Sequence, residues 1–346
     1  MTKIPVTVLG ATGVVGQRFV RRLAHHPLFE IHHLAASERS RGKAYQEACA
    51  WRLPGEAYCG RGGQVLVQGT PSEALAPIVF SALDTEPARD LEPAFAAAGA
   101  LVFSNAAAFR MASDVPLLIP EVNAPHLALL HAQRATRGWK GGIVCNPNCT
   151  ATMLAIALAP LHETFGVEAV LMASLQAVSG AGYPGVPSLD ILGNVVPFIR
   201  NEEAKVEEEL PKLLGTRDGA RITPGVFGVS ALCHRVPVVD GHSEAVSVRL
   251  RGNPSLDAVR EAFMAWKPEP RLPSSPERAI RLHTAEDRPQ PRLDVEADDG
   301  LSVHIGRLRP CSVLGLKFNL LGHNTERGAA AASILNAELA VKEGLQ

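Results

Sequence analysis

Apolar residues fall into two kinds of run along the chain, and the change between them divides it into two parts. Up to about residue 105, short apolar runs alternate with longer segments of helical spacing. Strands are predicted at 4–9, 29–35, 78–82, 101–104 and 143–145, and helices at 14–25 and 87–98. Strands that alternate with helices indicate a parallel sheet whose connections cross over its faces.

Beyond residue 168 the apolar runs become longer, and proline- and glycine-rich loops separate them. Strands are predicted at 168–178, 243–250, 301–308 and 312–321, and helices at 202–214, 256–266 and 326–342. This pattern favours a second domain with a mixed or antiparallel sheet. Between the two parts, 150–161 is apolar on all sides, which predicts a buried helix.

Composition narrows the class of protein. A chain of 346 residues with 46% hydrophobic and 20% charged residues predicts about two folded domains, and excludes a mini-protein or a mainly disordered chain. A net charge of −1 offers no positive field for nucleic acid. Because no apolar run is as long as a membrane helix and the start reads as a strand, we expect a soluble, cytoplasmic protein with no nucleic-acid or membrane partner.

One of the six cysteines stands in a special position. Their wide scatter, without a C-x-x-C pair, predicts reduced thiols and no metal site. Cys149 follows the strand at 143–145 and begins the buried helix, where unpaired N–H groups stabilise a thiolate. A redox partnership with Cys145 stays open, while the others are expected to be small buried hydrophobes: Cys49, Cys59, Cys233 and Cys311.

A glycine-rich turn joins the first strand to the first helix. Gly10, Gly13 and Gly16 form G-x-x-G-x-x-G in the position where backbone N–H groups approach a pyrophosphate, so dinucleotide binding is favoured over a plain tight turn. The second strand ends in Ser37-Glu38-Arg39-Ser40, where a guanidinium between hydroxyls suits the 2′-phosphate of NADP. Glu38 keeps NAD open as the alternative.

Three further segments carry candidate chemistry and equally plain alternatives. His242, in a turn that leads into a strand, is the best-placed base for Cys149, but taken singly it fits a surface loop just as well. The small-residue loop from Gln176 to Tyr183 could approach a flat ring or be a flexible connector. The charged run 201–209, taken alone, reads as a solvated helix face.

Together these residues resemble the aspartate-β-semialdehyde dehydrogenase family, in the branch found in archaea, fungi and some bacteria. The resemblance covers essentially the whole chain, and its most specific pieces are GATGVVGQRF at 10–19, NPNCT at 146–150, QAVSGAGYPGV at 176–186, NEEAK at 201–205 and RVPVVDGHSE at 235–244. It implies a Rossmann-type doubly wound parallel sheet domain, made by 1–148 plus 325–346, that binds NADP. It also implies an α+β catalytic and dimerisation domain with a mixed sheet, made by 149–324.

The resemblance also implies roles for individual residues. Cys149 would be the nucleophile, His242 the general acid/base, and Gln176 the group that aligns substrate and thiol. Arg235 would bind the substrate carboxylate and Glu202, or the adjacent Glu203, its ammonium group. Phosphate would be held by Arg110, Asn148 and Lys205, and NADP by Gly10, Thr12, Gly13, Val14, Val15, Ser37, Arg39, Ser40, Ser179, Gly180 and Asn324.

The activity that the resemblance implies is the reversible, NADPH-dependent conversion of 4-phospho-L-aspartate to L-aspartate 4-semialdehyde and phosphate through a thioester. Its partners would be these small molecules and, in a homodimer or homotetramer, further copies of the chain, a dimer being our expectation; the apolar strand at 168–178 fits a subunit interface. Malonyl-CoA reductase or another acyl-phosphate reductase on the same scaffold is the alternative. A thiol hydrolase and a non-catalytic NADP-binding protein explain fewer of the motifs.

Overall fold

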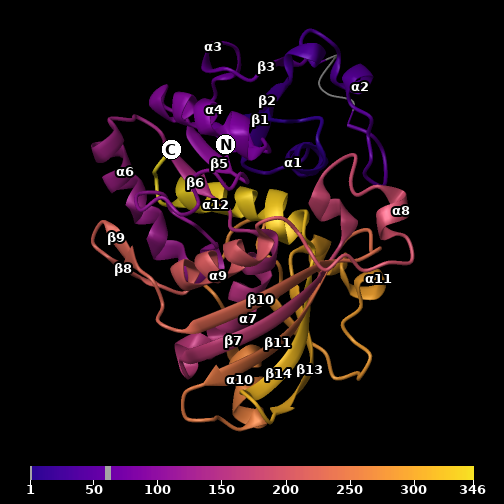
Figure 1. Ribbon diagram of the computed structural model, residues 1–346. Helices are drawn as coiled ribbons and strands as arrows, with labels where there is room; N and C mark the ends of the chain where they lie inside the picture. Colours follow the sequence, from indigo (N-terminus) through magenta and orange to yellow (C-terminus); the bar gives the residue numbers. More distant parts are fainter. Residues whose placement is uncertain (1, 59–63) are drawn as a thin grey trace.

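Two six-stranded sheets, built from successive parts of the chain, organise the structure, a computed structural model that describes residues 2–58 and 64–346 (Figure 1). Cys59, one of the expected reduced thiols, lies outside the described residues. The first sheet is entirely parallel, with the order β3-β2-β1-β4-β5-β6. Its strands are β1 (Ile4–Leu9), β2 (Phe29–Ala36), β3 (Val67–Gln68), β4 (Ile78–Ser81), β5 (Leu101–Ser104) and β6 (Gly142–Cys145).

The strand order reverses beside β1, because the chain first moves outward through β2 and β3 and then continues from β4 on the other side. Every residue of β4, β5 and β6 is buried, as expected for strands covered on both faces. Crossover helices connect them: α1 (Val14–Leu23), α2 (Tyr45–Ala48), α3 (Pro71–Ala74), α4 (Thr85–Ala97), α5 (Pro120–Asn123) and α6 (Leu129–Arg137). The doubly wound parallel sheet is therefore confirmed, while the short β3 and four of the helices, α2, α3, α5 and α6, were not predicted.

The second sheet is mixed, with the order β10-β7-β11-β14-β13-β12. The pairs β10 with β7 and β12 with β13 are parallel, and the other three are antiparallel. Its strands are β7 (Val167–Gln176), β10 (Gly228–Arg235), β11 (His242–Leu250), β12 (Ile280–Leu282), β13 (Val303–Cys311) and β14 (Gly315–Gly322). The sequence patterns missed β10 and β12, which are the two edge strands.

Helix α7 (Cys149–Thr164) is the buried helix that the apolar run predicts. It packs against the second sheet, and every residue from Thr150 to Leu161 is buried. The remaining elements of this part are α8 (Ser188–Ile191), α9 (Glu202–Leu213), the hairpin of β8 (Thr216–Asp218) and β9 (Arg221–Thr223), α10 (Leu256–Ala265) and α11 (Pro291–Asp294). None of the helices in the described residues is long and apolar enough to cross a membrane.

The end of the chain returns to the first sheet. A π-helical turn (Glu326–Ala330) continues into α12 (Ala331–Lys342), which packs against β4, β5 and α1. In Figure 1 this helix, in yellow, lies beside the first sheet and far from the lower end of the second. The division into 1–148 plus 325–346 and 149–324 remains a prediction, which this packing supports.

Candidate active site

The first turn of α7 presents Cys149. Asn148 is the N-cap, and its side-chain Oδ1 accepts a hydrogen bond of 3.0 Å from the backbone N–H of Ala151. The π-helical turn passes close by: a Cβ added to Gly328 would lie 2.5 Å from Cβ of Cys149. Glycine is therefore required at position 328 for the C-terminal segment to approach the thiol.

Burial is the main influence on the ionisation of Cys149. It raises the pKa of Cys149 to about 12, with Glu202 adding to the rise and Arg110 and Arg235 opposing it. The helix position alone therefore does not keep the sulfur ionised, contrary to the sequence-based expectation. The other cysteines of the described residues are also free: Cys49, Cys145 and Cys233 are buried, whereas Cys311 is half-exposed, so the expectation that it is a buried hydrophobe is wrong.

A buried network joins α7 to β7 and α9. Gln176, the last residue of β7, donates through Nε2 to Thr150 Oγ1 at 2.9 Å and to Glu202 Oε1 at 3.3 Å. Asn148 Nδ2 donates to the same Glu202 oxygen at 2.8 Å. Lys205 lies 3.5 Å from the second oxygen of Glu202. The structure thus brings four of the predicted site residues together around the start of α7.

Helix α9 is not a solvated face throughout. Glu202, Val206 and Glu209 form a buried stripe that faces the site, so the reading of 201–209 from its charge pattern alone is wrong for these positions. Glu203 points elsewhere, because it accepts a hydrogen bond from the backbone N–H of Cys233 on β10. Glu202 is the better placed of the two for a substrate ammonium group.

Arg110 lies in the same region but is held by protein groups. Its Nη1 donates to Glu209 Oε1 at 3.1 Å, and its Nη2 donates to the carbonyl of Asn105 at 2.7 Å. The second oxygen of Glu209 accepts from the backbone N–H of Asn148 at 2.5 Å. Of the two predicted phosphate-site cations, Lys205 is the more accessible, with its side chain 33% exposed against 10% for Arg110.

The backbone of Ala177 positions both His242 and Arg235. The N–H of Ala177 donates to His242 Nδ1 at 3.1 Å, and Arg235 Nη1 donates to the carbonyl of the same residue at 2.7 Å. Gly180 lies against both side chains, since a Cβ there would be 2.8 Å from Arg235 Nη1 and 3.1 Å from His242 Cε1. His242 is fully buried, so the reading as a surface loop histidine is wrong.

The protonation of His242 follows from these contacts. Burial, with Arg235 and His323 adding to it, lowers its pKa to about 3, so the imidazole is neutral at physiological pH. Because a backbone N–H can only donate, Nδ1 is the acceptor and the ring proton resides on Nε2. That Nε2–H has no partner in the described part of the chain and is a free hydrogen-bond donor in the buried site.

Asn324 ties two loops of the site to each other. Its Nδ2 donates to Ser179 Oγ at 2.8 Å, and its Oδ1 accepts from the backbone N–H of Gly241 at 2.9 Å. Both ends of the amide are therefore used to hold the loop after β7 against the turn before His242. The segment 178–181 is an ordered 3₁₀ turn, not a plain flexible connector.

The glycine turn between β1 and α1 has the shape of an anion site. Gly10 has φ of +71°, and a Cβ there would lie 2.6 Å from the carbonyl oxygen of Ala82. Gly16 is equally constrained, with a Cβ 2.1 Å from the Gly10 carbonyl oxygen. Gly13 is the N-cap of α1 and no side chain caps the helix, so the N–H groups of its first turn, which begins Val14-Val15, stay open to a ligand.

Residues on both sides complete this end of the first sheet. Thr12 lies in the turn itself, and its carbonyl accepts from Gln17 Nε2 at 2.9 Å. After β2, a 3₁₀ turn (Glu38–Ser40) follows Ser37, with Ser37 and Arg39 exposed. The glycine turn follows β1 and the segment 37–40 follows β2, and these two strands are parallel neighbours. Both segments therefore lie at the same edge of the sheet, beside the point where the strand order reverses.

Sequence reasoning missed two buried acids of the site. Glu209 pairs with Arg110, and its spacing of seven residues from Glu202 was a signal that both share one helix face. Glu244 on β11 is also buried, and neither of its carboxylate oxygens has a partner among the described residues; burial and Glu202 raise its pKa well above the usual range. The inward-facing register of Glu244, two residues after His242, was the available signal.

Comparisons with known proteins agree with this geometry. Residues 5–130 match the family model described as semialdehyde dehydrogenase, NAD binding domain, and residues 158–327 match the semialdehyde dehydrogenase dimerisation domain. Aspartate-semialdehyde dehydrogenase of Archaeoglobus fulgidus is 53% identical over 98% of each chain, and that of Cryptococcus neoformans is 45% identical over 99% of this chain and 98% of the relative.

Solved structures give the same result. Aspartate semialdehyde dehydrogenase from Candida albicans, crystallised with NADP, superposes with a TM-score of 0.91 at 39% identity and 100% coverage of both chains. Aspartate semialdehyde dehydrogenase II from Vibrio cholerae, in complex with ASA, superposes with a TM-score of 0.78 at 26% identity and 99% coverage of both chains.

Proposed function

Because the chain belongs to the aspartate-semialdehyde dehydrogenase family, we propose that it reduces 4-phospho-L-aspartate with NADPH to L-aspartate 4-semialdehyde and phosphate, reversibly. This aldehyde is the branch point toward lysine, methionine and threonine. The observation that carries the proposal is Cys149 at the start of α7, with Glu202, Gln176 and Arg235 from three other elements around it.

The covalent steps follow from these groups. The Cys149 thiolate attacks the acyl carbon of the phosphorylated substrate, a C–S bond forms, the C–O bond to the phosphate breaks, and inorganic phosphate leaves. NADPH, when bound, supplies a hydride to the resulting thioester. Collapse of the thiohemiacetal breaks the C–S bond and returns the electron pair to sulfur as the aldehyde is released. Since the pKa of the free thiol is about 12, it loses its proton as the substrate enters, where the cations Arg110 and Arg235 favour the thiolate. The phosphate leaves carrying one proton, which balances this loss, and the thiolate released with the aldehyde takes a proton from solvent.

His242 would act here as a donor. Its neutral imidazole carries the free Nε2–H, which can donate to the substrate oxygen as that oxygen gains negative charge. A lone pair on Nε2, which a general base needs, requires the opposite tautomer and the loss of the hydrogen bond from Ala177. The role thus sharpens from general acid/base, implied by the resemblance, to an electrophile that holds the oxyanion.

Substrate binding would use charges at the two ends of the site. Arg235 keeps one Nη and its Nε for the α-carboxylate, and Glu202 receives the α-ammonium group. Lys205 is the accessible cation for phosphate, and Asn148 contacts the same Glu202 carboxylate. Arg110, which is more buried, would add positive electrostatic potential without direct contact. Gln176, fixed by Thr150 and Glu202, aligns the substrate with the thiol.

The first sheet fits NADP. The left-handed Gly10 and the close backbone packing at Gly16 hold a tight turn, and the uncapped start of α1 leaves N–H groups that can meet a pyrophosphate. Gly10, Thr12, Gly13, Val14 and Val15 would hold the pyrophosphate, while Ser37, Arg39 and Ser40 would hold the 2′-phosphate. Ser179, Gly180 and Asn324 would lie near the nicotinamide.

We also propose a homodimer, with a homotetramer as the larger form, acting in the cytoplasm, which the free thiols of the described residues support. One face of β7 and β10 is apolar and uncovered: Leu171, Leu175 and Leu232 are 45%, 49% and 59% exposed. Such a patch favours burial against a second copy. A Leu175→Lys variant should shift the mass measured by light scattering toward the monomer, whereas an unchanged mass would contradict this interface.

The activity is tested by phosphate-dependent reduction of NADP with aspartate semialdehyde and the purified protein. Activity that requires phosphate supports the proposal, and activity without phosphate contradicts it. Malonyl-CoA and N-acetylglutamyl phosphate, each supplied with NADPH, serve as the competing acyl donors. Faster turnover of either one than of 4-phospho-L-aspartate would overturn the assignment.

A further inference from the structure

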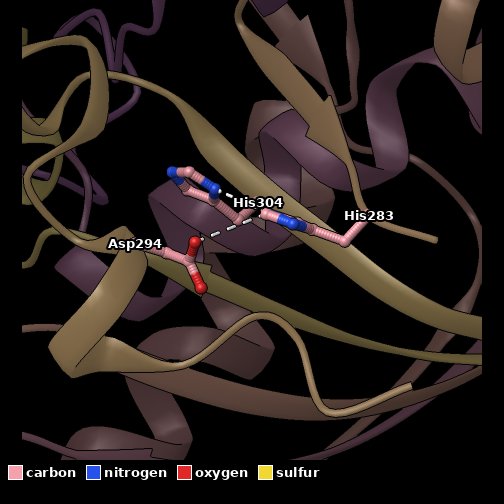
Figure 2. A group of neighbouring side chains, drawn as sticks. All are labelled: His283, Asp294 and His304. Carbon is pink, nitrogen blue, oxygen red and sulfur yellow. Dashed lines mark hydrogen bonds and ion pairs between the residues drawn. The ribbon is translucent and has the colours of Figure 1, made fainter. Parts of the chain in front are cut away.

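A second group of chemically active side chains lies at the far edge of the second sheet. His283 follows β12 directly, His304 is on β13, and Asp294 is the last residue of α11. Figure 2 shows the three side chains turned toward one another from these separate elements. They contribute nothing to the proposed reaction, since none of them contacts Cys149 or its partners in the network described above.

Their geometry is that of a three-ligand set. His283 Nε2 is 2.9 Å from His304 Nδ1 and 4.0 Å from Asp294 Oδ1, and all three ligand atoms lie within 4.8 Å of one another. Ligands held at about 2.0–2.2 Å around one tetrahedral ion are separated by comparable distances. The ring centroids are 5.2 Å apart with the planes at 25°, and the two nitrogens face each other along the line between the rings as a hydrogen bond, which a bound ion would replace.

The imidazoles are in the form that binds a metal. Burial lowers the pKa of His304 to about 4 and lowers that of His283 as well, so both rings are neutral at pH 7. His304 is 1% exposed, and its Nδ1 forms the hydrogen bond to His283 Nε2, while its Nε2, on the far side of the ring, has no partner among the described residues. A tautomer of His304 with the proton on Nε2 leaves the lone pair of Nδ1 directed at His283 and able to bind an ion there.

Asp294 is oriented by its own partners. Its Oδ2 accepts from Arg288 Nε at 2.8 Å and from the backbone N–H of Gln290 at 2.7 Å, and Arg288 Nη2 also contacts Oδ1. Outer-shell donors of this kind fix a ligating carboxylate. The Arg288 cation also offsets the carboxylate charge, which makes the site a moderate binder and favours ions that gain most from imidazole nitrogen.

We propose that His283, Asp294 and His304 bind one divalent transition-metal ion, such as Zn(II) or Co(II). Two imidazoles and one carboxylate suit these ions better than Mg²⁺ or Ca²⁺, which prefer oxygen. The half-exposed side of His283 leaves room for water as the fourth ligand. The ion would cross-link α11 to β13 and to the end of β12.

This cross-link would stabilise a region that supports the active site. Helix α11 packs on the turn that carries His242, since a Cβ on Gly241 would lie 3.4 Å from Cβ of Pro291 and 2.9 Å from Cγ2 of Val295. Fixing α11 would therefore stabilise the packing of Pro291 and Val295 against the turn at Gly241. The reaction itself needs no metal at this place, so the expected effect is on stability.

The test is a titration of the metal-free full chain with Zn(II) and Co(II). Because Cys149 could also bind these ions, all proteins carry Cys149→Ser. We expect one equivalent by calorimetry, a Co(II) spectrum without a thiolate charge-transfer band, and a thermal midpoint that rises with Zn(II). His283→Gln should weaken binding about tenfold or more and abolish the thermal shift.

Two further variants make the result decisive. His131→Gln, at an exposed histidine of α6, is the matched control and should bind as the parent does. Asp294→Asn keeps the shape of the side chain while removing its charge, and should also weaken binding. Absence of a bound equivalent in the Cys149→Ser protein, or equal binding by His283→Gln and His131→Gln, would overturn the proposal.

Discussion

The starts of α1 and α7 solve the same physical problem in opposite ways. Each helix follows a buried strand of the first sheet and presents the N–H groups of its first turn. At α1 the N-cap is Gly13, no side chain caps the helix, and the turn before it is built from glycines. At α7 the N-cap Asn148 satisfies the N–H of Ala151, and a thiol occupies the first helical position.

The two helix starts suit different tasks. An uncapped glycine turn packs tightly on its own backbone and leaves N–H donors open, which suits a ligand that binds reversibly. A capped and buried terminus instead fixes one side chain, Cys149, and lets cations and acids around it decide its ionisation.

The largest expected effect is at α7. Cys149→Ala removes the nucleophile, so phosphate-dependent reduction of NADP should be abolished while NADP binding at α1 is unchanged. Steady-state assays and a fluorescence titration with NADPH measure the two quantities. Cys145→Ala is the matched control and should retain activity. Normal turnover by Cys149→Ala would contradict the proposed mechanism.

The next effect is at the donor beside the thiol. His242→Asn should fold normally and slow turnover by roughly a hundredfold to a thousandfold, the usual cost of removing one donor to an oxyanion. His242→Gln, whose longer amide reaches further, should recover part of the rate if a hydrogen-bond donor is what the reaction needs. Equal rates for the Asn and Gln variants and the parent would refute the role.

The pH dependence of kcat tests the state of His242 directly. With its pKa lowered to about 3, the ring stays neutral above that value and gains a proton only below it. The rate should therefore show no acid limb near pH 6.5 that is assignable to His242, and any limb there should persist in His242→Gln. A limb near 6.5 that disappears in the variant would contradict the buried neutral ring.

Two glycines of the turn before and within α1 differ in the space around them. A Cβ on Gly16 would lie 2.1 Å from the Gly10 carbonyl oxygen, whereas a Cβ on Gly13 meets that atom at 3.4 Å, an ordinary contact. Gly16→Ala should weaken NADPH binding by about tenfold or more, since backbone shifts of this kind cost about 1–3 kcal/mol. Gly13→Ala meets no protein atom closer than this ordinary contact and should leave the stability of the free protein unchanged, whereas Gly16→Ala should lower it. Equal losses of stability in both variants, measured by urea unfolding, would show that the turn is not held as described.

The sequence predicts these two termini well because both depend on local order along the chain. The glycine spacing after an apolar strand and the NPNC run before an apolar helix place both helix starts within one residue of their observed positions. The parallel sheet followed from alternating patterns of the same kind. Local signals were sufficient wherever a function depends on neighbouring residues.

Contacts between distant segments could not be predicted in the same way. The pairing of Arg110 with Glu209, the neutral state of His242 and the approach of Gly328 to Cys149 depend on how separate elements pack. His283, Asp294 and His304 lie about ten residues apart in sequence, a spacing that matches no metal motif, so the sequence predicted no metal site. The edge strand β10 was missed because its exposed Leu232 and buried Cys233 gave no clear apolar run.

The smallest expected effect concerns the cap that distinguishes α7 from α1. Asn148→Ala removes the hydrogen bond from the Ala151 N–H, and loss of an N-cap typically lowers the free energy of unfolding by about 1 kcal/mol. Urea unfolding would measure this change. Asn148→Ser keeps a capping oxygen but loses the amide that donates to Glu202, so it should restore the stability without restoring the affinity for phosphate. If the stability and the phosphate affinity fell together in both variants, capping and ligand binding would be one function of Asn148, and the contrast between the two helix starts would be narrower than the structure indicates.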